Sequence, residues 1–152
     1  MTEPPSHYEA GSSAETARHA LEAWLSPEIG RRLELVRLIR DGFSLELVGA
    51  LARQTGVRLE ELAESDVIPR RTLAHSRQNE RFTPTQSARL ARFFRVQQMA
   101  RRTFGSDEKA MLWLKRPTKP LRDNAPVALL DTDEGARLVE ELLTRIDHGI
   151  AA

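Results

Sequence analysis

The apolar residues of this chain recur every three or four positions over most of its length, which is the spacing of amphipathic helices. Residues 1–13 are polar and predict a mobile arm. A short helix is expected to begin at Ala14 and to end before Pro27, and Ser12 and Glu15 fit a capping box at its start. The apolar positions of this helix are Ala17, Ala20, Leu21, Trp24 and Leu25.

The pattern at residues 31–40 does not distinguish a helix from a strand. Its apolar residues fit a buried helix and a buried strand equally well, and they are Leu33, Leu35, Val36, Leu38 and Ile39. Gly42 is expected to end the element. We predict that residues 14–43 form a helical N-terminal extension, whose role stays open between capping the core and building a dimer contact.

Two short amphipathic helices are predicted next. Ser44 fits the N-cap of a helix that runs through Thr55 and stops at Gly56, with an inward face of Val48, Leu51 and Ala52. Residues 58–65 then place three apolar side chains on one helical face, namely Leu59, Leu62 and Ala63.

A third helix is expected after a short turn at residues 66–68. Pro69 would be its first residue, a position that tolerates proline because its amide needs no partner there. Leu73 is expected to face inward. The polar residues would face mostly outward, and they are Arg70, Arg71, Thr72, His75, Ser76 and Arg77.

A long helix is predicted from Pro84 to Phe104. Thr83 and Gln86 form a capping box at its start, and Gly105 closes its far end. Its apolar side consists of Leu90, Phe93, Phe94, Ala100 and Phe104. The arginines of the opposite side are most simply interpreted as solvated, and they are Arg92, Arg95 and Arg102.

The last third of the chain has its own helix signals. Ser106 fits the N-cap of a helix that stops before Pro117, and a loop with three prolines follows at residues 115–126. Thr132 fits the N-cap of a final helix that stops at Gly149, with an apolar stripe of Ala136, Val139, Leu142, Leu143 and Ile146. The whole pattern predicts an all-α protein.

Charge is distributed unevenly along the 152 residues, although the net charge is only +1. Residues 1–30 carry one basic and five acidic residues, for a net charge of −4. Residues 31–122 carry twenty basic and ten acidic residues (+10), and residues 123–152 carry two and seven (−5). A cationic middle suits nucleic-acid phosphate and an acidic end suits a different partner, while a solvated arginine-rich face is the alternative.

Several classes of chemistry lack the residues that they need. There is no cysteine, which excludes disulfides and thiol catalysis. The four histidines are scattered, and neither a glycine-rich phosphate loop nor a nucleophile elbow occurs. We therefore expect no enzyme, no cofactor and no metal site. Without an apolar run of membrane-spanning length or a signal pattern, a cytoplasmic protein is expected.

Two short helices joined by a tight turn, the second rich in Arg, Thr, Ser and His, are typical of a helix-turn-helix. The first side chains of such a recognition helix enter the major groove, where arginine can hold guanine through two hydrogen bonds. Arg70, Arg71 and Thr72 occupy these positions. The candidate DNA contacts are Arg58, Arg70, Arg71, Thr72, His75, Ser76 and Arg77.

Residues 68–77 (IPRRTLAHSR) resemble the second helix of the Xre/MbcA/ParS-type antitoxins, which belong to RES–Xre type II toxin–antitoxin systems. The last third of the chain resembles their C-terminal toxin-binding domain. The pattern that carries this resemblance includes Phe104-Gly105, Trp113-Leu114, Pro117, Leu121, Leu129-Leu130, Thr132, Leu142-Leu143, Ile146 and Gly149. Two features depart from the family, since Arg122-Asp123 replaces a glycine pair and Val67 replaces a turn glycine.

The resemblance implies a helix-turn-helix DNA-binding domain with its long connecting helix at residues 44–105, followed by a small helical toxin-binding domain at residues 106–152. It further implies an antitoxin that binds a RES-domain, NAD-depleting toxin encoded by the adjacent gene and covers its active site. The helix-turn-helix would bind operator DNA and repress the shared operon. The candidate toxin contacts are Trp113, Pro117, Leu121, Thr132, Arg145, Asp147, His148, Gly149 and Ile150.

A second hypothesis is a stand-alone helix-turn-helix regulator, or a DNA-anchoring protein, whose C-terminal domain only oligomerises. Under both hypotheses a homodimer is expected, because helix-turn-helix proteins usually read two half-sites with two-fold symmetry. The nature of the adjacent gene would distinguish the two.

Overall fold

The computed structural model describes residues 10–149, and within this range every regular element is a helix. The predicted all-α fold is therefore confirmed. In chain order the elements are α1 (Ala10–Trp24), α2 (Ile29–Asp41), α3 (Leu45–Thr55), α4 (Leu59–Glu64), α5 (Arg70–Asn79), α6 (Pro84–Phe104), α7 (Asp107–Lys115), the 3₁₀ helices η1 (Lys119–Leu121) and η2 (Pro126–Leu129), and α8 (Asp133–Asp147).

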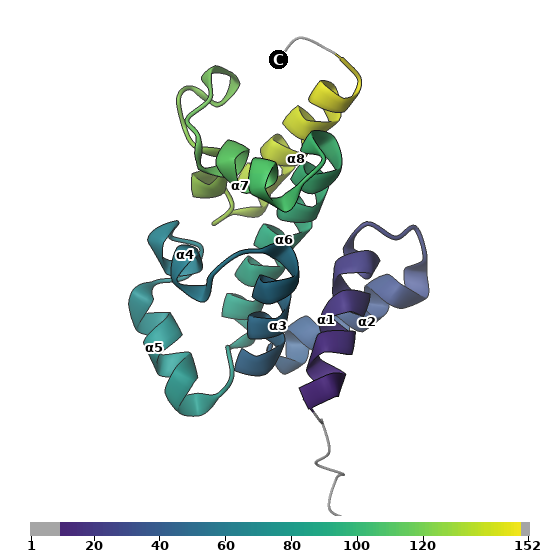
Figure 1. The fold of residues 1–152 in the computed structure, drawn as a ribbon, viewed down its shortest axis with the longest axis vertical. Coiled ribbons are helices and arrows are strands. Elements are labelled where there is room, and N and C mark those ends of the chain that lie inside the picture. The colour runs from purple at the N-terminus through teal and green to yellow at the C-terminus, as the bar shows by residue number, and fades with distance from the viewer. Residues whose placement is uncertain (1–9, 150–152) are drawn as a thin grey trace, which may run out of the picture.

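The longest helix, α6, runs through the centre of the molecule (Figure 1). The pair α1 and α2 lies on one side of it, and α4 and α5 lie on the other. α1 packs against α3, α2 packs against α6, and both α7 and α8 pack against the C-terminal part of α6. α6 is thus common to the helix-turn-helix and to the C-terminal helices.

The predicted helix caps are confirmed at four starts. The hydroxyl of Ser44 accepts from the amide of the third helical residue of α3 at 3.0 Å, and Thr132 does the same for α8 at 3.0 Å. Thr83 forms the expected capping box of α6, and Ser106 caps α7. Such caps satisfy amides that have no partner inside the helix, so short-range sequence is enough to place them.

The N-terminal extension differs from its prediction. α1 begins at Ala10, so only residues 1–9 of the expected arm remain, and these lie outside the described residues. The capping box of Ser12 and Glu15 is wrong, because both residues lie inside α1. Residues 31–40 are helical, within α2, and Leu35 is their one fully buried apolar side chain.

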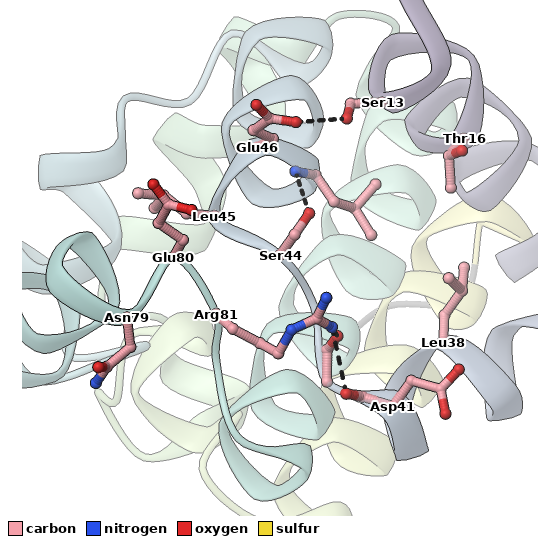
Figure 2. A pocket seen from close by; sticks show the side chains of 12 residues that line it. Ser13, Thr16, Leu38, Asp41, Ser44, Leu45, Glu46, Asn79, Glu80 and Arg81 are labelled. Atoms are coloured by element: carbon pink, nitrogen blue, oxygen red, sulfur yellow. Dashed lines mark hydrogen bonds between the residues drawn. The ribbon is translucent and has the colours of Figure 1, made fainter. Parts of the chain in front are cut away.

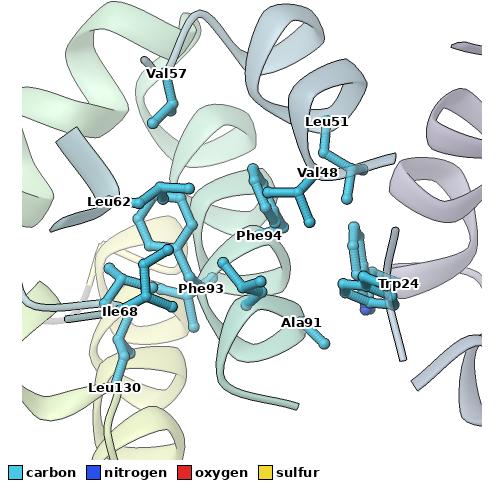
Figure 3. Packing of buried hydrophobic residues seen from close by; sticks show 14 of the residues in the cluster. Trp24, Val48, Leu51, Val57, Leu62, Ile68, Ala91, Phe93, Phe94 and Leu130 are labelled. Carbon is cyan, nitrogen blue, oxygen red and sulfur yellow. The ribbon is translucent and has the colours of Figure 1, made fainter. Parts of the chain in front are cut away.

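The core is one continuous cluster that extends from α1 to α8 (Figure 3). At its centre the rings of Phe93 and Phe94 meet edge to face with centroids 5.1 Å apart, and Trp24 stacks on Phe94 at 6.1 Å. Leu130 brings the segment before α8 into the same cluster. Because each fully buried large side chain contributes about 1.5–3 kcal/mol, the two halves of the chain stabilise each other.

The arginines of α6 are not simply solvated, and that prediction is wrong for two of the three. Arg92 donates to the carbonyl oxygens of Leu130 and Asp131 at 3.1 and 3.2 Å, and Arg95 pairs with Glu140 of α8. α8 and the segment before it cover this side of α6, which the periodicity of one helix does not reveal. Arg102 is exposed, as predicted.

Candidate DNA-binding helix and C-terminal surface

The helix-turn-helix consists of α4, the turn at residues 65–69 and α5. The amides of Val67 and Ile68 both donate to the carbonyl oxygen of Leu62, at 2.9 and 3.2 Å, and both side chains are buried. These contacts fix the direction in which α5 leaves the turn. Pro69 precedes α5 as its N-cap, so the prediction that it is the first helical residue places the start of the helix one position too early.

The left-handed residue of the turn is Asp66, with φ of 56°, and not Val67. The resemblance to the family suggested that Val67, which replaces a turn glycine, would have to adopt the left-handed conformation. That suggestion named the wrong residue. Aspartate adopts this conformation more readily than a β-branched residue does. The carbonyl oxygen of Asp66 also accepts from Arg89 of α6 at 3.3 Å, which ties the turn to the central helix.

The leading side chains of α5 are available to a ligand. Arg70 and Arg71 are exposed, and within residues 10–149 neither lies at ion-pair distance from an acid. Thr72 is half-buried next to them. His75 is exposed, and its ring nitrogen lies 2.7 Å from the amide nitrogen of Asn79.

Ser76 cannot serve as an outward-facing contact, and this prediction is wrong. Its side chain is only 1% exposed, and its hydroxyl donates to the carbonyl oxygen of Leu73 at 2.7 Å. Serine satisfies its hydroxyl in this way when a helix turns it towards the core.

Two further candidate DNA contacts are paired with the acids of α4. Arg77 lies 3.1 Å from Glu60 and Arg58 lies 3.6 Å from Glu61 and 3.8 Å from Glu64. The side chains of both arginines are more than half exposed, so each ion pair is weak. A phosphate can therefore compete with the glutamates for these arginines. Among the candidate arginines, Arg70 and Arg71 have no such competing acid within residues 10–149.

The helix-turn-helix is joined to the C-terminal helices by polar contacts. Lys115 of α7 forms an ion pair with Glu61 of α4, with 3.2 Å between Nζ and Oε1. Partial burial raises the pKa of Glu61, but hydrogen bonds from Lys115 and from the backbone of Arg58 outweigh it, so the pKa lies below the ordinary value of 4.5. The buried Gln97 of α6 donates to Asp107 of α7 at 2.8 Å.

The C-terminal helices present charged and partly apolar side chains, and the surface of α8 is acidic. Trp113 is half-buried against Phe104, with ring centroids 5.4 Å apart, and Leu121 is half-buried as well. Pro117 is exposed. Thr132 is exposed, but its hydroxyl is already occupied as the cap of α8.

The end of α8 gathers most of the remaining candidates. Arg145, Asp147, His148 and Gly149 are all exposed, and the His148 ring lies 2.7 Å from the carbonyl oxygen of Thr144. Ile150 lies outside the described residues. The candidates therefore fall into a group along α7 and η1 and a group at the end of α8, while Thr132 lies at the start of α8.

Two exposed leucines were missed by the sequence analysis. Leu112 of α7 is 67% exposed and Leu138 of α8 is 52% exposed. Each lies outside the apolar stripe of its own helix, and this is the signal that would have identified it. Burial of such a leucine against a partner would favour binding, because it removes apolar area from water.

The loop between α7 and α8 keeps a left-handed conformation without glycine. Arg122 and Asp123 have φ of 53° and 64°, at the positions where the sequence departs from the glycine pair. The amides of Thr118 and Asp123 donate across the loop, at 3.2 and 3.0 Å, and hold it closed. The departure therefore leaves the loop geometry in place at a conformational cost.

A cleft of about 540 Å³ lies between α1, α3 and the segment that joins α5 to α6 (Figure 2). Its polar groups bind one another. Ser13 donates to Glu46 at 3.3 Å, and Arg81 donates to the carbonyl oxygen of Gly42 at 2.7 Å, just beyond the end of α2. These bonds hold the N-terminal helix pair against the helix-turn-helix.

Comparison with known proteins identifies both halves of the chain. Residues 34–95 match the antitoxin Xre-like helix-turn-helix domain, and residues 99–149 match the antitoxin Xre/MbcA/ParS C-terminal toxin-binding domain. No helix among the described residues is long and apolar enough to cross a membrane.

Three curated relatives are named Antitoxin Xre. One from Yersinia enterocolitica is 35% identical over 137 residues, which is 89% of this chain and 93% of the relative. One from Pseudomonas putida is 33% identical over 134 residues, covering 87% and 83%. One from Photorhabdus laumondii is 44% identical over 73 residues, covering 47% and 49%. With its helix-turn-helix and its toxin-binding domain, this chain belongs to the family of Xre-type antitoxins.

Proposed function

We propose that this antitoxin neutralises a RES-domain, NAD-depleting toxin encoded by the adjacent gene, and that it represses their shared operon through α5. It acts by binding and not by catalysis. The C-terminal helices cover the entrance of the toxin's active site, and a homodimer reads the operator in the cytoplasm. The observation that carries this proposal is the separation of an unpaired cationic helix start, at Arg70 and Arg71, from the acidic helix α8 with its exposed Leu138.

The acidic surface suits a pocket that binds NAD. The pyrophosphate of NAD requires a positively charged site, and the last 30 residues of this chain carry a net charge of −5. In this proposal Asp147 and His148, at the exposed end of α8, enter such a site, and the exposed Leu138 adds an apolar contact elsewhere on the same helix. Burial of the leucine would add to the affinity, because it removes apolar area from water, while the acidic side chains would favour the encounter.

The toxin-binding part is tested with Leu138→Arg. This change places a charge at an apolar contact and should weaken the complex with the co-expressed RES-domain protein by about 100-fold or more. Cells that carry the variant should lose NAD and stop growing when the toxin is induced. Leu33→Arg, an equally exposed leucine of α2, is the matched control and should protect fully. Equal protection by both variants would refute the proposed surface.

The DNA-binding part is tested with Arg70→Ala on the fragment upstream of the operon. Loss of one bidentate contact to guanine costs about 1–3 kcal/mol, so affinity should fall roughly 10- to 100-fold. Arg102→Ala on the exposed face of α6 is the control. Affinity for the wild type should also fall steeply with added salt. Toxin neutralisation by Arg70→Ala should be intact, and loss of both activities in a folded variant would contradict the separation of the two surfaces.

A further inference from the structure

Arg89 of α6 holds the turn of the helix-turn-helix by a hydrogen bond. Its Nη2 donates to the backbone carbonyl oxygen of Asp66 at 3.3 Å. Within residues 10–149 no other hydrogen bond joins this turn to α6. Asp66 is the left-handed residue of the turn, and Arg70 and Arg71 begin α5 four positions later. The contact therefore lies next to the residues that would meet the bases of DNA.

The orientation of α5 depends on this turn, because few of the helix's own side chains are buried. Of its ten residues only Leu73 and Ser76 are buried, and α5 packs against α4 at the outer edge of the molecule (Figure 1). Val67 and Ile68 anchor the end of the turn in the core. The backbone of Asp66 is instead held by hydrogen bonds to α4 and to α6. The direction of α5 is therefore set by the turn more than by the packing of α5 itself.

A cavity of about 270 Å³ is lined by the turn, by Arg89 and by the segment before α8. The turn contributes residues 65–67, and the segment contributes Leu130 and Asp131 with part of η2. On this side the turn faces a cavity and not close-packed side chains, so packing does not fix it there. One helical turn further along α6, Arg92 binds the carbonyl oxygens of the opposite lining. Two arginines of α6 thus hold two different linings of one cavity.

Stability alone does not account for an arginine at position 89. Its Nε is buried and has no hydrogen-bond partner among residues 10–149, which is unfavourable. In the same part of the chain its guanidinium forms no ion pair, unlike those of Arg92, Arg95 and Arg101 on the same helix. An unbranched apolar side chain such as methionine would fill the space without burying an unpaired donor. What arginine adds at this position is the hydrogen bond to the turn.

We propose that Arg89 is a positioning residue for DNA binding, which holds the turn so that Arg70 and Arg71 meet the bases in the geometry that paired hydrogen bonds require. Arg89 itself contacts no base. The inference rests on the DNA-binding part of the proposed function and adds to it a residue of α6. Hydrogen bonds to base edges weaken steeply with misalignment, whereas non-specific binding depends on charge. A loosened turn should therefore lower the affinity for the operator and leave the affinity for unrelated DNA nearly unchanged.

Arg89→Met tests the inference on the fragment upstream of the operon. Affinity for this fragment should fall about 10-fold, and affinity for unrelated DNA of the same length should change by less than about 2-fold. Arg102→Met removes the same charge from an exposed position of α6, so it is the matched control and should bind like the wild type. Equal affinity of both variants for the operator would overturn the inference.

The salt dependence of binding separates positioning from a direct phosphate contact. The slope of the logarithm of the binding constant against the logarithm of the salt concentration should be the same for Arg89→Met and the wild type. A slope smaller by about one would make Arg89 a phosphate contact, and the positioning role would then be wrong.

Two measurements on the protein alone separate positioning from folding. The urea midpoint of Arg89→Met should stay within about 0.5 M of the wild type, because the lost bond is offset by the removal of a buried unpaired donor. A larger fall would make Arg89 a residue for stability and overturn the inference. The amides of Val67 and Ile68, which donate to Leu62, should exchange hydrogen at least about 3-fold faster in Arg89→Met, while the cap amide of Gly135 keeps its rate. Unchanged exchange at the turn would also refute the proposed role.

The behaviour of the wild type and of Arg70→Ala distinguishes a failure of this inference from a failure of the proposed function. If the wild type does not bind the upstream fragment, the DNA-binding part fails and the role of Arg89 fails with it. If the wild type binds and Arg70→Ala binds more weakly, full affinity of Arg89→Met refutes this inference alone. Toxin neutralisation by Arg89→Met should match the wild type, because Arg92 still holds the segment before α8. Its loss would show that Arg89 acts on the C-terminal helices and would overturn the inference.

Discussion

Arg92→Ala measures how strongly α6 holds the C-terminal helices. The guanidinium of Arg92 is 17% exposed and lies 3.4 Å from the carboxylate of Asp133, which is 80% exposed. That ion pair contributes about 0–1 kcal/mol. The same guanidinium donates hydrogen bonds to the carbonyl oxygens of Leu130 and Asp131. Because the donor is charged, each of these bonds contributes about 1.5 kcal/mol to the free energy of unfolding. We expect a total loss of about 3 kcal/mol in the free energy of unfolding.

Urea unfolding followed by circular dichroism checks this value. With a slope of about 1–3 kcal/mol per molar urea, the midpoint should fall by about 1–3 M. Arg102→Ala is the control, since Arg102 is an exposed arginine of the same helix, and its effect should stay within about 0.5 kcal/mol. If the two variants shift the midpoint equally, Arg92 is a solvated side chain and the proposed link to the C-terminal helices is wrong.

Three further predictions follow from local geometry. Gly135→Ala would place a Cβ atom 1.7 Å from the carbonyl oxygen of Leu129, so we expect a loss of about 3 kcal/mol or more in thermal or urea unfolding; an unaltered midpoint would contradict the packing. Arg122→Gly should raise stability by about 1 kcal/mol, because it relieves a left-handed residue, and a decrease would show that the arginine side chain matters more than its backbone. Lys115→Met should lower the free energy of unfolding at pH 7, because it removes the ion pair with Glu61. The difference from the wild type should disappear as the pH falls through the lowered pKa of Glu61, where the carboxylate becomes neutral. A difference of equal size at all pH values would exclude the ion pair.

The sign of this pH dependence follows from the direction of the shift. A carboxyl group whose pKa is lower in the folded state stabilises the fold above its unfolded pKa, and this contribution is lost on acidification. Glu61 is therefore expected to stabilise the junction between α4 and α7 at neutral pH. Below its folded pKa the wild type and Lys115→Met should become alike.

The sequence by itself determined the helices from α3 onwards and the family. Caps such as Ser44 and Thr132 act on amides two or three residues away, so the sequence pattern is sufficient to locate them. The apolar stripe of α8 predicted its core face for the same reason. The resemblance of the C-terminal third depends on residue types at fixed spacing, and the match of residues 99–149 to the toxin-binding domain agrees with it.

The tertiary structure alone decided which polar faces are covered. Ser76 is buried and Arg92 is bound by α8 and its preceding segment because elements distant in sequence pack there, and no spacing within α5 or α6 contains that information. The left-handed residue of the turn is likewise set by how Val67 and Ile68 enter the core. For α2 the pattern fitted a helix or a strand, and only packing against α6 selected which of its apolar residues stay outside. Burial depends on contacts between residues far apart in the chain, whereas a sequence pattern reports neighbours.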